Sequence, residues 1–167
     1  HGSGTYLSEK FIHHVEKIDA RVFERKDQIN GFLHSIETRM LMEPSVCQKA
    51  AEKINDKQQN ELIKRVNSIF KSKYWINFKK SIYDFFLTIY TIADNEEVLH
   101  VFAELYNERE KLNFDGRGTQ TLVSSIVRHN THIELNKLSQ LIIQKKPEEA
   151  KKFSEQYLNK IFLSLSA

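Results

Sequence analysis

A chain of 167 residues has the size of one domain, and such a domain buries about two thirds of the surface that its unfolded form exposes. Hydrophobic residues make up 40% of the chain and charged residues 28%, with only 5 Gly and 2 Pro, a composition that favours helices over a β-sandwich or barrel. The 25 basic and 22 acidic residues nearly balance, so the charge lacks the excess that is typical of a nucleic-acid-binding domain. We therefore expect one all-α domain that does not itself bind DNA well.

The cysteine content and the hydropathy of the chain predict its compartment. Cys47 is the only cysteine, which excludes an intramolecular disulfide. No apolar run reaches the roughly 18 residues that a membrane span needs, and the first residues lack the pattern of a signal peptide. These features predict a soluble, cytoplasmic protein without membrane contact. Since the sequence begins with His1-Gly2 and not with Met, we expect it to be a fragment of a longer chain.

The spacing of apolar residues predicts helices along most of the chain. The first covers residues 27–54, and we expect it to kink or restart at Pro44, because proline removes a backbone donor. The second is expected to be capped by Asp56 and to end near Lys73. The third covers residues 74–92 and carries an apolar face that is too wide and too aromatic for a surface helix. This third helix should be central in the fold.

Breaks in the apolar pattern separate the remaining helices. Asp94-Asn95 precedes a helix that covers residues 98–112 and runs to a glycine-containing loop at 115–118. A long helical segment follows over residues 119–144, and Pro147 opens a last helix. The prediction is an all-α antiparallel bundle of about six to seven helices.

Two motifs in the first part of the chain resemble those of a known family. Gly2-Ser3-Gly4-Thr5 resembles the wing tip of a GntR-family winged-helix domain, where a tight turn beside DNA favours glycine. The run from Arg39 to Pro44, followed by Ala50-Ala51, resembles the first long helix of that family's sensor domain. This sensor domain is the FadR C-terminal type, called FCD.

Two further motifs follow in the same order as in the FCD domain. Phe85-Phe86 with Ile89 and Asn95 resembles the family's Phe-His-x-x-Ile run that ends in Asn. Residues 145–150 resemble the turn into its final helix. Because the order and the spacing of all four motifs agree, the resemblance extends over essentially the whole chain.

The resemblance implies a division of the chain and a function. Residues 1–8 would be a remnant of the winged-helix wing and linker, and residues 9–167 would be the helical effector-binding and dimerisation domain of a transcription regulator. A homodimer of such domains binds a small-molecule effector and contacts operator DNA through its N-terminal domains, which the present sequence lacks. The resemblance implies neither an enzyme nor a cofactor.

Many members of the family hold a divalent metal in the bundle. Their ligands are an Asp and a His one turn apart on the middle helix and one His from each of the last two helices. The corresponding positions in this sequence are Ile82, Phe86, Leu135 and Tyr157. A lone phenol is a poor metal ligand, so the resemblance implies a metal-free cavity that suits an acyl-type or other apolar effector. The alternative is that these side chains fill the core and leave no cavity.

Arg39 is the predicted anchor for the polar end of an effector. A planar guanidinium donates two hydrogen bonds to a carboxylate or phosphate and keeps its charge when partly buried. The alternative is a pair within the helix between Arg39 and Glu43, four residues further on. The other polar candidates for contact with the effector are Tyr83, Asn95, Arg128 and Tyr157.

Two competing functions remain open at this point. The pairs Glu97-x-x-His100 and His129-x-x-His132 have spacings that are used in metal-dependent helical enzymes. A di-iron bundle needs a second Glu-x-x-His copy, which the sequence lacks. The simpler interpretation of His129 and His132 is that they are surface or interhelical histidines. The other competing function is a purely structural dimerisation module.

Overall fold

The computed structural model describes the backbone of residues 9–112 and 121–166 and the side chains of residues 30–107 and 121–166. The expected wing remnant at 1–8 and the expected loop at 115–118 lie outside these residues. Within them the chain forms helices and no sheet, which confirms the predicted all-α fold. The helices are α1 (Glu9–Lys53), α2 (Asp56–Lys71), α3 (Trp75–Ala93), α4 (Glu96–Leu112), α5 (Ser125–Ile143) and α6 (Pro147–Ser166).

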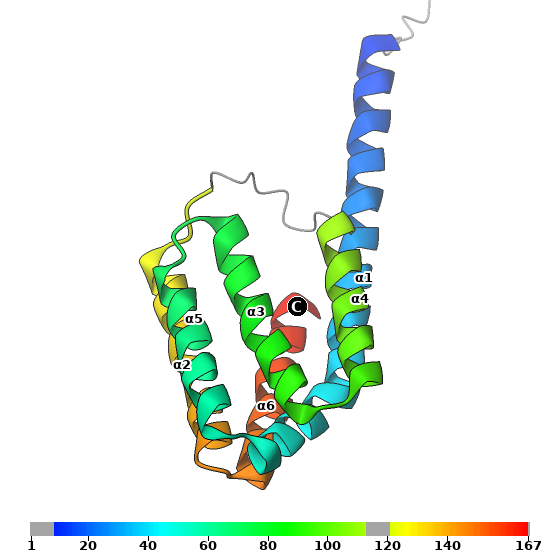
Figure 1. The fold of residues 1–167 in the computed structure, drawn as a ribbon. Coiled ribbons are helices and arrows are strands. Elements are labelled where there is room, and N and C mark those ends of the chain that lie inside the picture. Colours follow the sequence, from blue (N-terminus) through cyan, green and yellow to red (C-terminus); the bar gives the residue numbers. More distant parts are fainter. Residues whose placement is uncertain (1–8, 113–120, 167) are drawn as a thin grey trace, which may run out of the picture.

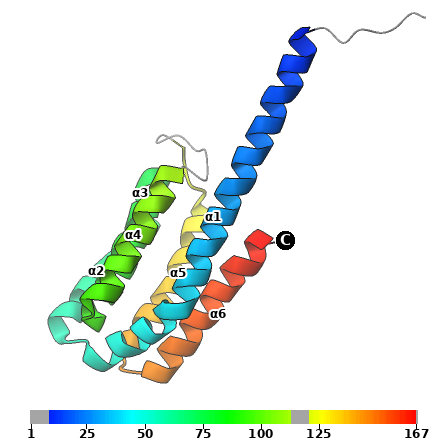
Figure 2. The same ribbon diagram turned by 90° about the vertical axis from the view of Figure 1, so that its right-hand side faces the viewer.

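Successive helices run in opposite directions and form an antiparallel bundle (Figure 1). Helix α3 packs against α1, α2 and α4, as predicted for a central helix. Helices α1 and α6 lie side by side in both views, and α2 packs against α5 (Figures 1 and 2). None of the described helices is both long and apolar enough to cross a membrane. The largest fully buried side chains are Ile36, Ile54, Leu62, Ile69, Phe85, Phe86, Ile89, Tyr90, Leu135, Leu138, Ile142 and Leu158.

Helix α1 is continuous over 45 residues and contains Pro44. The expected restart at Pro44 is therefore wrong. A proline removes one backbone hydrogen bond, but burial of apolar side chains on the following turns, such as Cys47 and Ala50, offsets this loss. The N-terminal part of α1 projects well beyond the other helices (Figures 1 and 2).

Helix α2 is capped by Asn55 and not, as expected, by Asp56. The Asn55 side chain accepts a hydrogen bond from the Gln58 backbone at 3.0 Å, and the Gln58 side chain accepts one from the Asn55 backbone at 3.0 Å. Both Asn and Asp are good capping residues, so the reciprocal bond to Gln58 decides between them. Asp56 becomes the first helical residue, where its negative charge interacts favourably with the positive end of the helix dipole.

A short backbone bridge joins the start of α3 to the segment before α5. Trp75 donates its backbone N–H to Thr121, and Val123 donates to Lys73, both at 2.8 Å. The two segments thereby meet as an isolated antiparallel bridge in an otherwise helical fold. This bridge holds the beginnings of α3 and α5 side by side.

Candidate functional site

Arg39 and Glu43 form a buried ion pair on α1. Nε of Arg39 donates to one carboxylate oxygen of Glu43 at 2.7 Å, and Nη2 donates to the other at 3.0 Å. Arg39 is 6% exposed and Glu43 is 0% exposed. Burial by itself lowers the pKa of the guanidinium, but the adjacent Glu43 carboxylate outweighs this, so the pKa of Arg39 is raised. Arg39, the predicted anchor, is thus charged and paired with Glu43, which is the alternative that the sequence left open.

Aromatic side chains from α3 and α6 surround this ion pair. The Phe86 ring lies 4.7 Å from Cζ of Arg39, and the Tyr157 ring stacks on Phe86 with 6.3 Å between centroids. The Tyr90 hydroxyl donates to Glu43 at 3.5 Å. Burial, and then the Glu43 charge, raise the pKa of Tyr90, so its hydroxyl stays neutral and remains a donor. The ion pair is therefore enclosed by rings where α1, α3 and α6 meet.

Cys47 extends this polar cluster by one turn along α1. Its side chain is fully buried, and it lies beside the hydroxyl of Ser154 on α6. Burial first, and then the Glu43 carboxylate, raise the pKa of the Cys47 thiol. A protonated, buried thiol is a poor nucleophile, so Cys47 acts here as a packing residue.

The four positions that correspond to the family's metal ligands all belong to the core. Phe86 and Leu135 are buried, while Ile82 and Tyr157 are partly buried and pack against the same core cluster. Of the four, Phe86 and Tyr157 contact each other, and Phe86 also contacts Arg39. Among the described residues, no group of three or more His, Cys, Asp or Glu is placed to hold a metal ion.

Two other predicted effector residues, Tyr83 and Asn95, have partners on or beside α4. Tyr83 stacks on two rings of α4, those of Tyr106 at 3.8 Å and Phe102 at 5.4 Å. Asn95 caps α4, where its side chain accepts the N–H of Val98 at 3.2 Å. Each side chain thus has a structural role at the place where it stands.

Arg128 binds the C-terminal end of α2. Its Nη1 donates to the carbonyl of Phe70 at 2.6 Å, and its Cζ lies 5.6 Å from the centre of the Phe70 ring. A cation that donates hydrogen bonds to the last carbonyls of a helix interacts favourably with the negative end of the helix dipole. Arg128 therefore joins α5 to α2.

The two histidine pairs are not brought together. His132 contacts Asn67 at 3.2 Å, and the rings of His129 and His132 lie 6.1 and 6.0 Å from that of Phe70. Burial, and then the neighbouring His129, lower the pKa of His132. The other pair, on α4, is exposed, and Figure 1 shows α4 and α5 on opposite sides of α3. His129 and His132 thus contact the neighbouring helix α2, in agreement with the simpler interpretation.

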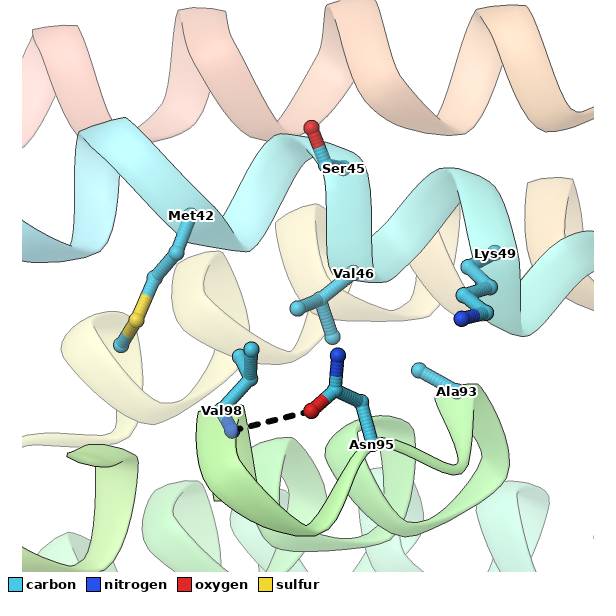
Figure 3. Close-up of a pocket in the computed structure, with 7 residues that line it drawn as sticks. All are labelled: Met42, Ser45, Val46, Lys49, Ala93, Asn95 and Val98. Atoms are coloured by element: carbon cyan, nitrogen blue, oxygen red, sulfur yellow. Dashed lines mark hydrogen bonds between the residues drawn. The ribbon is translucent and has the colours of Figure 1, made fainter. Parts of the chain in front are cut away.

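A small cavity that the sequence analysis missed lies between α1 and the turn from α3 to α4 (Figure 3). Its volume is about 160 Å³. No local pattern predicts it, because its walls come from two segments far apart in the chain. Its lining residues are Met42, Ser45, Val46, Lys49, Ala93, Asn95 and Val98.

No family model, curated protein or solved structure matches this chain. The likeness to the GntR family therefore rests on the motifs of the sequence.

Proposed function

We propose that this chain is the effector-responsive, dimerising domain of a GntR-type transcription regulator, in which a ligand at Arg39 repositions α1. One observation carries the proposal: the buried guanidinium lies on the same continuous helix that projects beyond the bundle. A winged-helix DNA-binding domain, which the resemblance places before residue 9, would be attached at the projecting end. The domain itself performs no catalysis in this proposal.

Arg39 has donors to spare for a ligand. A guanidinium has five N–H groups, and Glu43 accepts through Nε and Nη2. A ligand carboxylate or thioester carbonyl would accept from the remaining N–H groups or displace Glu43. Its carbon chain would lie against the rings of Phe86 and Tyr157, which suits an acyl-type effector and needs no metal.

The length of α1 amplifies a small movement at Arg39. Arg39 lies 30 residues beyond Glu9 in one helix, which corresponds to about 45 Å at the usual rise per residue. A tilt of about 5° at the bundle would move the far end by about 4 Å. Such a switch requires only that the effector bind the two positions of α1 unequally, and a few kcal/mol of difference is enough.

An apolar surface on α2 and α5 supports the proposed homodimer. Ile126 and Ile133 lie on the same side of α5 because they are seven residues apart, and both are exposed. The exposed ring of Phe70 on α2 lies next to them, since it contacts His129. Exposed clusters of large apolar side chains are typical of interfaces, and we assign this α2–α5 surface to a second copy of the chain.

A melting experiment with defined probes tests the ligand site. We expect decanoate or decanoyl coenzyme A to raise the melting temperature in a saturable manner, by about 2.7 kcal/mol of stability at 100 times the dissociation constant. The double variant R39M/E43Q removes both buried charges and should abolish this effect. The matched control R65M/E61Q removes a partly exposed pair with an N–O distance of 2.6 Å, away from Arg39, and should retain it.

A distance measurement tests the switch itself. Spin labels at position 13 of both protomers, introduced as His13→Cys in a Cys47→Ala background, report the separation of the projecting helices. Decanoate should change this separation by several Å. If neither probe stabilises the protein, the ligand site is refuted. If a probe stabilises it without changing the separation, the chain is a structural module and the regulatory proposal fails.

A further inference from the structure

We propose that the cavity between α1 and the α3–α4 turn is a second small-ligand site, which takes a short branched monocarboxylate of about four to six carbons. It is distinct from the Arg39 cluster. Met42, Val46 and Lys49 follow one another at i, i+4 and i+7, so they share the side of α1 that faces the turn. Arg39 and Glu43 do not line this cavity: Arg39 contacts the ring of Phe86, and Glu43 accepts a hydrogen bond from Tyr90, both on α3.

The floor of the cavity is apolar. Figure 3 shows the side chains of Met42, Val46 and Val98 directed toward one space, with Ala93 at its edge. The volume of about 160 Å³ is close to that of cavities that hold a benzene molecule, about 150 Å³. A branched chain of four to six carbons therefore fills this space, and a longer chain would extend into solvent on its open side.

Asn95 turns a hydrogen-bond donor toward this floor. Its Oδ1 accepts the N–H of Val98 at 3.2 Å, and this bond fixes the orientation of the amide. The amide nitrogen is consequently directed into the cavity, toward Val46 (Figure 3). A donor held in place by a cap costs little to order when a ligand binds.

Lys49 supplies a positive charge at the same place. Its ammonium group lies at the wall of the cavity and forms no ion pair with a described residue. The carboxylate of Asp94 is close enough to interact with this charge, but it is already bound to Lys53 at 2.9 Å. Ser45, the remaining polar lining residue, directs its hydroxyl away from the cavity (Figure 3).

The polar groups that face the apolar floor are thus an ammonium and an amide N–H. No carboxylate lines the cavity. Such a set favours an anionic acceptor, and a carboxylate bridging Lys49 and Asn95 would use both donors. A ligand held in this way would join α1 to the α3–α4 turn beside the Lys53–Asp94 pair.

Methionine methyl NMR of the full 167-residue chain tests the site directly. The chain has 2 methionines, so Met42 has a signal of its own and Met40 serves as an internal control. Titration with isovalerate should shift the Met42 signal in a saturable manner and leave that of Met40 in place. The uncharged analogue 3-methylbutan-1-ol should bind at least about tenfold more weakly, because it lacks the charge-assisted bonds.

Two variants separate the proposed contacts from a general effect of charge. Lys49→Gln should weaken isovalerate binding about tenfold, whereas the control Lys57→Gln, at an exposed position on α2, should not. Asn95→Asp keeps the cap of α4 but replaces the donor by an anion, so it should abolish isovalerate binding and leave that of the alcohol unchanged.

Three results would overturn the proposal. The first is the absence of a saturable Met42 shift with isovalerate. The second is equal affinity for the acid and the alcohol. The third is an equal loss of affinity in the Lys49 and Lys57 variants, which would indicate attraction by net charge and no specific site.

Discussion

The guanidinium of Arg39 and the carboxylate of Glu43, one turn apart on α1, are joined by two hydrogen bonds inside the bundle. A pair of this kind at the surface contributes a few tenths of a kcal/mol. Here Glu43 is fully buried and Arg39 is only 6% exposed, and Tyr90 donates a further hydrogen bond to Glu43. The two charges depend on each other because each would otherwise be buried without a partner.

Removal of one member of this pair should destabilise the fold far more than removal of both. We expect Arg39→Met to lower the free energy of unfolding by about 3–5 kcal/mol, because it leaves the Glu43 carboxylate buried and uncompensated. The double variant R39M/E43L should lie within about 1–2 kcal/mol of the parent or above it. Urea unfolding measures both. A double variant as unstable as the single one would show that the charge pair itself stabilises the fold.

The capping box of α2 makes a prediction that distinguishes two neighbouring residues. Asn55→Ala should lower the free energy of unfolding by about 1 kcal/mol, since it removes the side-chain bond to the Gln58 backbone. Asp56→Ala should have a smaller effect, because Asp56 contributes only its charge in the first turn. Thermal unfolding of the two variants gives the comparison, and the reverse order would identify Asp56 as the cap.

Alkaline pH should destabilise the fold through Cys47 and Tyr90. Burial raises the pKa of both groups above the ordinary values of 9.0 and 10.0. Above about pH 9 the unfolded chain therefore releases protons that the folded chain retains, and the free energy of unfolding falls as pH rises. Cys47→Ala should make this decline shallower between pH 9 and 11, as measured by urea unfolding. An unchanged slope would contradict the assignment to Cys47.

The same burial should protect Cys47 from modification. An aromatic disulfide reagent that releases thionitrobenzoate should react with Cys47 of the native protein only as fast as the fold opens. In urea the same reaction should be rapid. The absorbance of the released thiolate follows this reaction. Immediate stoichiometric reaction of the folded chain would show that the thiol is accessible.

The proposed homodimer predicts a change of mass from one surface substitution. Ile126→Lys places a charge in the α2–α5 surface, at a side chain that is 71% exposed, and should convert the dimer to a monomer. Leu163→Lys makes the same kind of change at a side chain of α6 that is 59% exposed, and should leave the dimer intact. Sedimentation equilibrium reports the mass of each variant. Dissociation by Leu163→Lys alone would move the interface to α6.

The helices were predictable because their signals are local. The wide apolar face of residues 74–92 predicted the central α3, and Pro147 indeed begins α6. The errors fell at element ends and at proline. The cap of α2 was predicted one residue too late, and a restart at Pro44, one of the two alternatives there, is excluded by the continuous α1. The outcome at Pro44 depends on the packing of the following turns against other helices. The cap depends on Gln58, only three residues from Asn55, so it was a local signal that had been overlooked.

The candidate site was predictable only in part. The spacing of Arg39 and Glu43 made their pairing one of two open alternatives, and the structure has that pair. Tyr90 was missed because nothing in its local sequence indicates a bond to a residue on another helix. The role of Arg128 was missed for the same reason, since its partner Phe70 lies on another helix. The role of Asn95 is local, because it caps its own helix, and the break at Asp94-Asn95 was a signal for it.

The sequence by itself determined that the chain forms an all-α bundle, since the helical repeat and the scarcity of Gly and Pro operate within a few residues. The tertiary structure decided which charges are buried, which rings enclose Arg39, and that a small cavity opens beside Lys49 and Asn95. These features depend on how separate helices meet. Contact between helices is set by the packing of whole side-chain surfaces, which no local pattern of residues specifies.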